Sequence, residues 1–97
     1  MEPAPIRRVV LDLLKPHEPS TIEFAREIAG VEGVTGVNAM VIEVDAEVEN
    51  IKVTVEGDAI DFPAVEAAVA ELGGSLHSVD QVACGEHLIE ESETPQD

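Results

Sequence analysis

The order in which the hydrophobic period changes along the chain constrains the fold more than any other feature. Residues 6–14, 37–44, 51–57 and 75–84 have the two-residue apolar alternation of strands that bury one face. Two stretches with helical spacing lie between them, after the first strand and after the third. The chain therefore predicts the order strand, helix, strand, strand, helix, strand.

Both helices carry recognisable end signals. Ser20 with Glu23 three residues later is a capping-box pattern, and the helix that follows is expected to stop at Gly30. Its predicted buried stripe is Ile22, Ala25, Ile28 and Ala29. Asp61 is the expected cap of the second helix, which ends at Gly73. Its predicted stripe is Val65, Ala68, Val69 and Leu72.

The length of 97 residues suits one domain, residues 1–97. Residues 1–5 are expected to be a flexible lead, and residues 86–97 an acidic extension with room for a short edge strand. Residues 15–19 contain two prolines and are expected to form a loop, and residues 45–50 to form a polar hairpin loop. These segments are expected to be loops within one domain and not linkers between domains.

The element order predicts an α+β class, the ferredoxin-like βαββαβ sandwich. Right-handed crossovers give an antiparallel sheet of strand order 4-1-3-2 with both helices on one face. The uncovered face is expected to carry Val10, Leu14, Ala39 and Val41 among the charges Arg8, Asp12 and Lys52. A half-apolar bare sheet favours pairing with a second copy, so we expect a homo-oligomer through the open sheet face or the edge strands.

The excess of acidic over basic residues indicates the kind of environment the protein works in and the classes of partner it can bind. Five Lys or Arg stand against 21 Asp or Glu, for a formal net charge of −16, and the acids occur in every segment. An acidic surface of this kind destabilises the folded chain by repulsion between its charges, and high salt screens that repulsion. The composition therefore indicates a protein from the cytoplasm of a halophilic archaeon. Few basic residues argue against nucleic-acid binding. No apolar run approaches the roughly 20 residues that span a bilayer, so no membrane association is expected.

Four segments resemble a known family: LDLLKPHEP at 11–19, VENIKVTVEG at 48–57, GGSLHSVDQVACG at 73–85 and TPQD at 94–97. The chain is similar over nearly its whole length to the archaeal domain of unknown function 211. The resemblance implies a ferredoxin-like fold and oligomeric assembly, and it supplies no catalytic residue. Heavy-metal-associated and amino-acid-binding regulatory domains share this topology more distantly. The former use a CxxC pair in the first loop, where this chain has His17 and Glu18.

Topology gathers acidic and histidine side chains at one end of the predicted sheet. The first strand–helix loop, the hairpin and the loop before the last strand all emerge there. The candidate metal ligands are His17, Glu18, Asp45, Glu47 and Glu49, with Asp12 and His77 as accessory residues. Carboxylates with one imidazole suit calcium, magnesium, manganese or zinc. A solvated acidic hairpin of a salt-adapted protein is the competing interpretation.

Three functions remain open at this stage. The first is a non-enzymatic, oligomeric binding module, with a divalent cation as its candidate cofactor at the loop end. The second is a regulatory domain for an amino acid or similar metabolite, with its pocket at a subunit interface near residues 33–37. The third is a small enzyme with an inter-subunit site that uses His17 or His77 as general base. Since Cys84 has no Lys or Arg near it in sequence, we expect it to be a buried or interface side chain.

Overall fold

The computed structural model describes residues 3–90. Its elements, in chain order, are β1 (Ile6–Pro16), α1 (Thr21–Ala29), β2 (Val34–Val44), β3 (Val48–Gly57), α2 (Phe62–Glu71) and β4 (Ser75–Cys84). The predicted βαββαβ order is therefore confirmed. Within the described range, no helix combines the length and the apolar character needed to cross a membrane.

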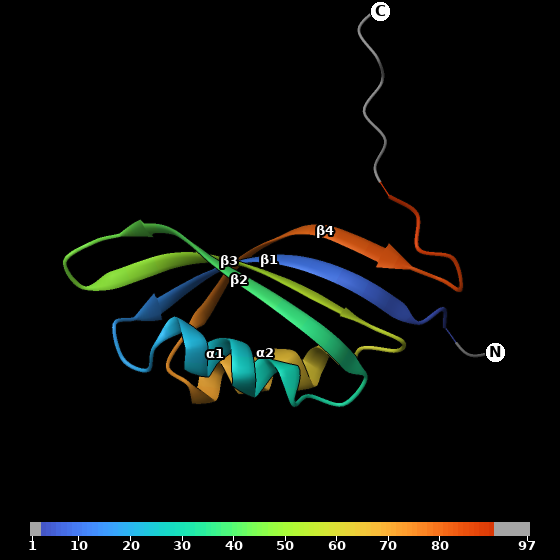
Figure 1. Ribbon diagram of the computed structural model, residues 1–97, viewed down its shortest axis with the longest axis horizontal. Helices are drawn as coiled ribbons and strands as arrows, with labels where there is room; N and C mark the ends of the chain where they lie inside the picture. Colours follow the sequence, from blue (N-terminus) through green and yellow to red (C-terminus); the bar gives the residue numbers. More distant parts are fainter. Residues whose placement is uncertain (1–2, 91–97) are drawn as a thin grey trace, which may run out of the picture.

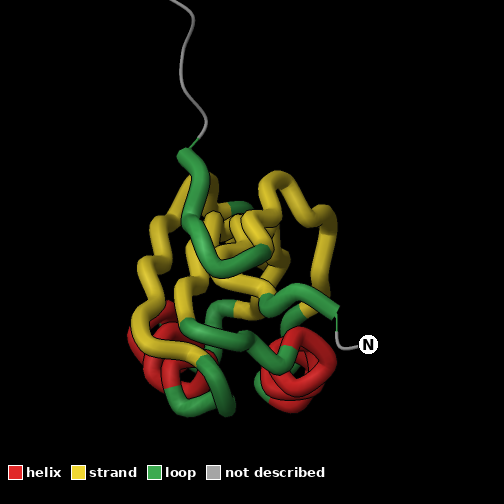
Figure 2. The backbone as a smooth tube through the Cα atoms, turned by 90° about the vertical axis from the view of Figure 1, so that its right-hand side faces the viewer, coloured by secondary structure: helices red, strands yellow, loops and turns green. Residues whose placement is uncertain are grey.

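The four strands form one antiparallel sheet of order β2-β3-β1-β4, which is the predicted order read from the other edge. Both helices lie on the same face of this sheet, and the other face is free of helices (Figures 1 and 2). The long central strands β1 and β3 thus have a neighbour on each side. The outer strands β2 and β4 each have one.

The core lies between the central strands and the two helices. Alternate residues of β1 and β3 point toward the helices, and α1 and α2 each add an apolar pair spaced four residues apart. The fully or almost fully buried set is Val9, Leu11, Leu13, Phe24, Ile28, Ile51, Val53, Val55, Ile60, Val65 and Val69. The strand alternation and the stripe of α2 agree with the sequence prediction.

The predicted buried stripe of α1 is wrong in part. Phe24 and Ile28 are its buried residues, whereas Ile22 is 69% exposed and Ala29 is also exposed. Phe24 lies two positions after Ile22, about 200° around the helix, so the two side chains cannot share a face. The sheet accommodates the larger aromatic ring, and Ile22 is left outside. The capping box between Ser20 and Glu23 is present as predicted.

Three strands are longer than expected. β1 continues to Pro16, although residues 15–19 were predicted as a loop, and β2 and β3 begin at Val34 and Val48. β4 ends its pairing with β1 at Leu14, so the last residues of β1 pair with β3 alone. Pro16 has no N–H to donate, and its position at a strand end beside one neighbour makes that loss harmless.

The assignment of two residues to the open face is also wrong. Ala39 is paired with Val53 and Val41 with Ile51, which places both on the side of the helices. The open face of β2 instead carries Asn38 and Met40. The prediction failed because both alternating sets of β2 contain apolar residues, so the alternation does not say which set faces the helices.

Two arginines attach the segment after β4 to the sheet. Arg7 donates from Nη1 to the carbonyl oxygens of Gly85 and Glu86, at 3.1 and 2.6 Å. Arg8 forms ion pairs with Glu56 at 2.7 Å and Glu90 at 2.6 Å. This segment runs over the side opposite the helices (Figure 2). Residues 85–90 form no strand, and the rest of the predicted extension, like residues 1–2 of the lead, lies outside the described range.

The two faces of α1 provide a direct stability test. Truncation of Phe24 to alanine removes a fully buried ring, and we expect a loss of about 3–5 kcal/mol in the free energy of unfolding. Truncation of the exposed Ile22 to alanine is expected to change it by less than about 0.5 kcal/mol. Urea unfolding of both variants at constant high salt measures the difference, and equal losses would contradict the described orientation of α1.

Candidate functional site

The end of the sheet at which β1 finishes brings together most of the residues predicted to form a site. β1 ends at Pro16, opposite Val48 at the start of β3, and β4 begins opposite Leu14. The β2–β3 turn is short because the backbone N–H of Asp45 donates to the carbonyl oxygen of Val48 at 2.8 Å. The predicted convergence of these loops is therefore present.

A buried lysine lies at the centre of this end. Lys15 follows Leu11 and Leu13 on the helix side of β1, and only 1% of its surface is exposed. Its Nζ donates to the carbonyl oxygen of Pro16 at 2.7 Å and to Oε1 of Glu49 at 3.1 Å. The ammonium also lies 5.4 Å from the centre of the Phe24 ring, within the range of a cation–π contact. Three independent contacts thus compensate the burial of this charge.

Glu49 joins Lys15 to His17. Its second oxygen, Oε2, lies 2.9 Å from Nδ1 of His17, and Nε2 of the same ring lies 2.9 Å from the carbonyl oxygen of Ala46. Both ring nitrogens therefore face acceptors, an arrangement that the doubly protonated imidazolium satisfies completely. Side-chain exposure rises outward along the chain of contacts, from 0% for Lys15 through 17% for Glu49 to 42% for His17.

These contacts shift the acidity of both partners. The Glu49 carboxylate, with the Ala46 carbonyl as a second acceptor, raises the pKa of His17 above its ordinary value. The hydrogen bonds from His17 and then from Lys15 lower the pKa of Glu49. The shifts are mutual, as they must be for a pair that attracts in its charged form. The network of Lys15, Glu49 and His17 therefore joins β1, β3 and the hairpin by charge.

The side chains of the other predicted ligands form no hydrogen bond or ion pair with those of Lys15, Glu49 and His17. Glu18, Asp45 and Glu47 are exposed, and so is His77 on β4. Asp12 lies on the open face, where Oδ1 accepts a hydrogen bond from Nδ2 of Asn50. Residues 3–90 contain no group of three or more His, Cys, Asp or Glu placed to hold a metal ion. For His17 and Glu49 to ligate a cation, the contact between Nδ1 of His17 and Oε2 of Glu49 would have to open. The divalent-cation site therefore stays a prediction.

Cys84 is exposed in the single chain. Burial within the chain was one of its two expected roles and is wrong, because Cys84 ends the outer strand β4, opposite Ile6. The interface role stays a prediction.

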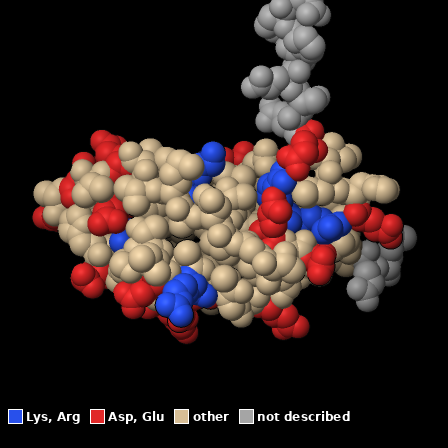
Figure 3. All heavy atoms as spheres, in the orientation of Figure 1, with Lys and Arg blue, Asp and Glu red and all other residues tan. Residues whose placement is uncertain are grey.

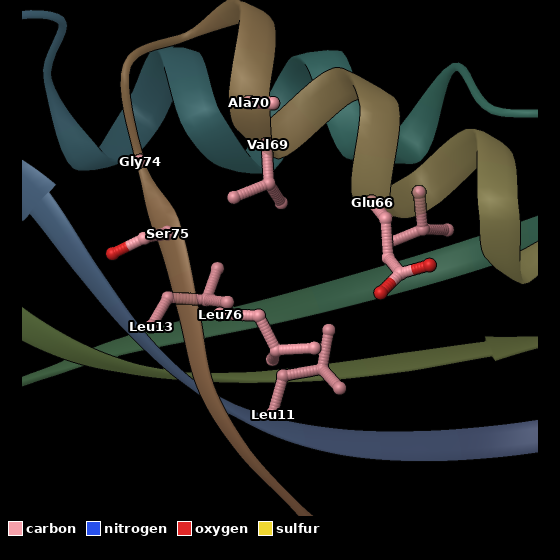
Figure 4. A pocket seen from close by; sticks show the side chains of 9 residues that line it. Leu11, Leu13, Glu66, Val69, Ala70, Gly74, Ser75 and Leu76 are labelled. Carbon is pink, nitrogen blue, oxygen red and sulfur yellow. The ribbon is translucent and has the colours of Figure 1, made fainter.

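Sequence reasoning missed a cavity between α2 and the β4 side of the sheet (Figure 4). Its volume is about 270 Å³. The lining residues are Leu11, Leu13, Val65, Glu66, Val69, Ala70, Gly74, Ser75 and Leu76. The helix contributes one small side chain, that of Ala70, and Gly74 contributes none. Gly74 is required there, because a Cβ atom would lie 2.9 Å from Cε2 of Phe24.

Glu66 is the one charged residue that lines this cavity. Its side chain extends from α2 toward the sheet, beside the leucines that form the floor (Figure 4). The cavity is therefore an aliphatic hollow with a carboxylate at its rim. A run of small residues in an otherwise ordinary helix stripe was the only sequence signal for it.

Comparison with known proteins places this chain in a family. Residues 7–97 match DUF211, which is described as "Uncharacterized ArCR". An uncharacterized protein of Methanocaldococcus jannaschii is 48% identical over 92 residues, which cover 95% of each chain.

The ion pair of His17 and Glu49 predicts a pH dependence of stability. Because the pKa of His17 is raised in the folded state, its contribution is complete below the ordinary value of 6.5 and is lost as the pH rises through the folded pKa. Because the pKa of Glu49 is lowered, its contribution is complete above 4.5 and is lost as the pH falls through the folded pKa. The pair thus stabilises most between pH 4.5 and 6.5.

Melting curves of His17→Gln against pH test this. The difference in Tm from the unmodified protein should be largest between pH 4.5 and 6.5 and should shrink as the pH rises through the folded pKa of His17. His77→Gln, at an exposed histidine on β4, is the matched control. A His17→Gln difference that does not vary with pH would refute the ion pair.

The engaged ligand atoms also predict the response to cations. In about 2 M KCl, where general screening is nearly complete, we expect calcium, magnesium, manganese and zinc to leave Tm unchanged. An ion-selective, saturating rise would instead identify a site, since specific binding at a hundredfold excess over Kd stabilises by roughly 2.7 kcal/mol. Alanine at Glu18, Asp45 or Glu47 would then remove that rise.

Proposed function

The chain belongs to the DUF211 family, and we propose that it acts as a non-enzymatic module that binds a small organic cation with an aliphatic body. The ligand lies in the cavity between α2 and β4. One observation carries the proposal: a preformed aliphatic hollow has a single carboxylate, that of Glu66, at its rim. Concave apolar sites with few polar groups are the usual form of small-molecule sites.

The size of the cavity limits the ligand. About 270 Å³ is just below the range of roughly 300–1,000 Å³ that is typical of ligand pockets. The body must therefore be small, such as a short linear or branched alkyl group. Leu11, Leu13 and Leu76 offer it an apolar floor, and each Å² removed from water contributes about 25 cal/mol.

Charge selects the polar end of the ligand. The net charge of −16 disfavours an anion anywhere on this surface, and Glu66 offers a local partner to an ammonium group. At high ionic strength only close contacts remain effective, so Glu66 counts for more than the distant acids. This argument assumes the salt-rich archaeal cytoplasm that we propose from the acidic composition.

The proposal replaces two locations considered from the sequence. The loop end has its central imidazole and carboxylate bonded to each other. The turn near residues 33–37 is closed within the chain, since a Cβ on Gly33 would lie 1.9 Å from the carbonyl oxygen of Ala59. The α2–β4 cavity is open, and a ligand can enter it without breaking the bond between His17 and Glu49 or displacing the backbone at Gly33. A metabolite-binding role is therefore kept, with its site moved to this cavity.

Three probes of one carbon skeleton test the proposal. In about 2 M KCl we expect isopentylamine to produce saturable amide shifts in α2 and β4 by NMR, isopentanol weaker ones, and isovalerate none. Ala70→Leu, which fills the cavity, should abolish the shifts, whereas Ala67→Leu on the same helix, outside the lining, should preserve them. Glu66→Gln should weaken the amine by up to about fivefold, to the level of the alcohol.

Absence of saturable binding by all three probes would refute the proposed function. Equal binding to the Ala70→Leu variant would move the ligand elsewhere. Since residues 67 and 70 are both exposed alanines of α2, the two variants carry the same helix-propensity change.

A further inference from the structure

The lining of the α2–β4 cavity contains an anion but no cation. Its 9 residues include Glu66, and none of them is Lys, Arg or His. The five basic residues of the chain all lie within residues 3–90 and outside this lining; they are Arg7, Arg8, Lys15, Arg26 and Lys52. A carboxylate placed in the cavity would therefore have no charged partner there, which makes its removal from water costly.

Lys15 is the basic residue that follows the cavity floor most closely in the chain, two positions after Leu13. Its ammonium group is already engaged. An ammonium has three N–H donors, and Nζ of Lys15 donates to the Pro16 carbonyl oxygen and to Glu49, while the Phe24 ring lies beside it. The negative charge of Glu49 also balances its positive charge. Lys15 therefore offers a bound carboxylate neither a donor nor a net attraction.

Uncharged donors do not replace a basic side chain in this cavity. The N–H of Gly74 donates to the carbonyl oxygen of Val69 at 2.9 Å. Ser75 has the one hydroxyl among the lining side chains, and in Figure 4 this hydroxyl extends to the side away from Glu66. The end of the cavity at Glu66 thus presents an acceptor without a neighbouring side-chain donor from the lining.

The end of α2 that lies beside the cavity also favours a cation. Val69 and Ala70 line the cavity and belong to the last turn of the helix, which ends at Glu71. Aligned peptide dipoles give this end a partial negative charge, and the last turn contains no basic side chain to offset it. The positive end of the helix is already bonded, because Asp61 accepts a hydrogen bond from the N–H of Ala64 at 3.3 Å.

The wider surface does not reverse this local preference. In the view of Figure 3, acidic side chains lie around most of the outline, and basic side chains form a few separate groups. The chain as a whole has 21 Asp or Glu against 5 Lys or Arg. The surface therefore adds no general attraction for an anionic group.

We propose that this cavity selects an aliphatic primary amine and rejects the α-amino acid with the same carbon skeleton. The inference rests on the proposed function and names its ligand class more closely. An α-amino acid carries the ammonium that Glu66 attracts, but its carboxylate is attached to the same carbon atom. That carboxylate would be brought toward Glu66, where it meets a like charge and no donor from the lining.

The distinction places the module relative to one class of reaction. When an α-amino acid is decarboxylated, the bond between Cα and the carboxylate carbon breaks, CO2 leaves, and a proton takes its place on Cα. The product is the primary amine of the same skeleton. A module with this cavity binds the product of such a reaction and not its amino-acid substrate, in contrast to the amino-acid ligand considered from the sequence.

Three ligands that share one skeleton test the inference. They are isopentylamine, L-leucine and L-leucinamide, titrated in about 2 M KCl at a pH at which every amine is protonated, with Kd taken from the amide shifts of α2 and β4. Leucinamide replaces the carboxylate by a neutral group of nearly equal size, so it controls for space. We expect leucinamide to bind as isopentylamine does, and leucine to bind about tenfold more weakly than leucinamide.

A substitution at Glu66 identifies the source of the selectivity. Glu66→Gln should reduce the difference between leucine and leucinamide from about tenfold to about twofold, because the repulsion is removed and only the lack of donors remains. Glu71→Gln is the matched control, since Glu71 is an exposed glutamate of the same helix outside the cavity lining. It should leave the tenfold difference unchanged.

The failure of this inference can be told apart from failure of the proposed function. If isopentylamine binds and leucine binds as tightly as leucinamide, the inference is wrong and the function stands. If isopentylamine binds while leucinamide and leucine both fail, space and not charge excludes the amino acid, which also overturns the inference. A selectivity that Glu66→Gln leaves intact would contradict the role given to Glu66. If isopentylamine itself does not bind, the proposed function fails, and the inference fails with it.

Discussion

The packing of two apolar helix pairs onto the central strands is the interaction on which the rest of the structure depends. Phe24 with Ile28, and Val65 with Val69, rest on the alternating aliphatic side chains of β1 and β3. These two strands are buried from both sides by neighbours and from one face by helices, so their register is fixed by the core. The outer strands contribute fewer buried side chains, and their free edges and remaining exposed apolar residues follow from that imbalance.

The same imbalance locates the functional features. Between α2 and the β4 side of the sheet, Ala70 carries a small side chain and Gly74 carries none, so the helix and the sheet leave space between them. This space is the cavity of about 270 Å³. The proposed ligand site is therefore a consequence of the small side chains at this point of the helical layer.

Sequence reasoning reached those parts of the fold that depend on local signals. The Ser20–Glu23 capping box, the Asp61 cap and the element order rest on contacts between near neighbours in the chain, and topology then placed His17 and Glu49 at the same end. The buried face of α1 could not be predicted from the sequence, because either Ile22 or Phe24 can belong to an apolar stripe with helical spacing. Which of them is buried depends on how the helix packs on the sheet. Lys15 was missed because lysine is almost never fully buried and two prolines after it suggest a loop. The cavity depends on the sum of several side-chain volumes, which no single position reveals.

The burial of Lys15 has a consequence for the chemical reactivity of the protein. The chain has two lysines, and the amine of Lys15 is covered by Phe24 and held by Glu49 while that of Lys52 is exposed. An acylating reagent in water meets Lys52 in the folded chain, and it meets Lys15 only after the core has opened. The two lysine side chains therefore form a built-in pair of reporters, one for the surface and one for the integrity of the fold.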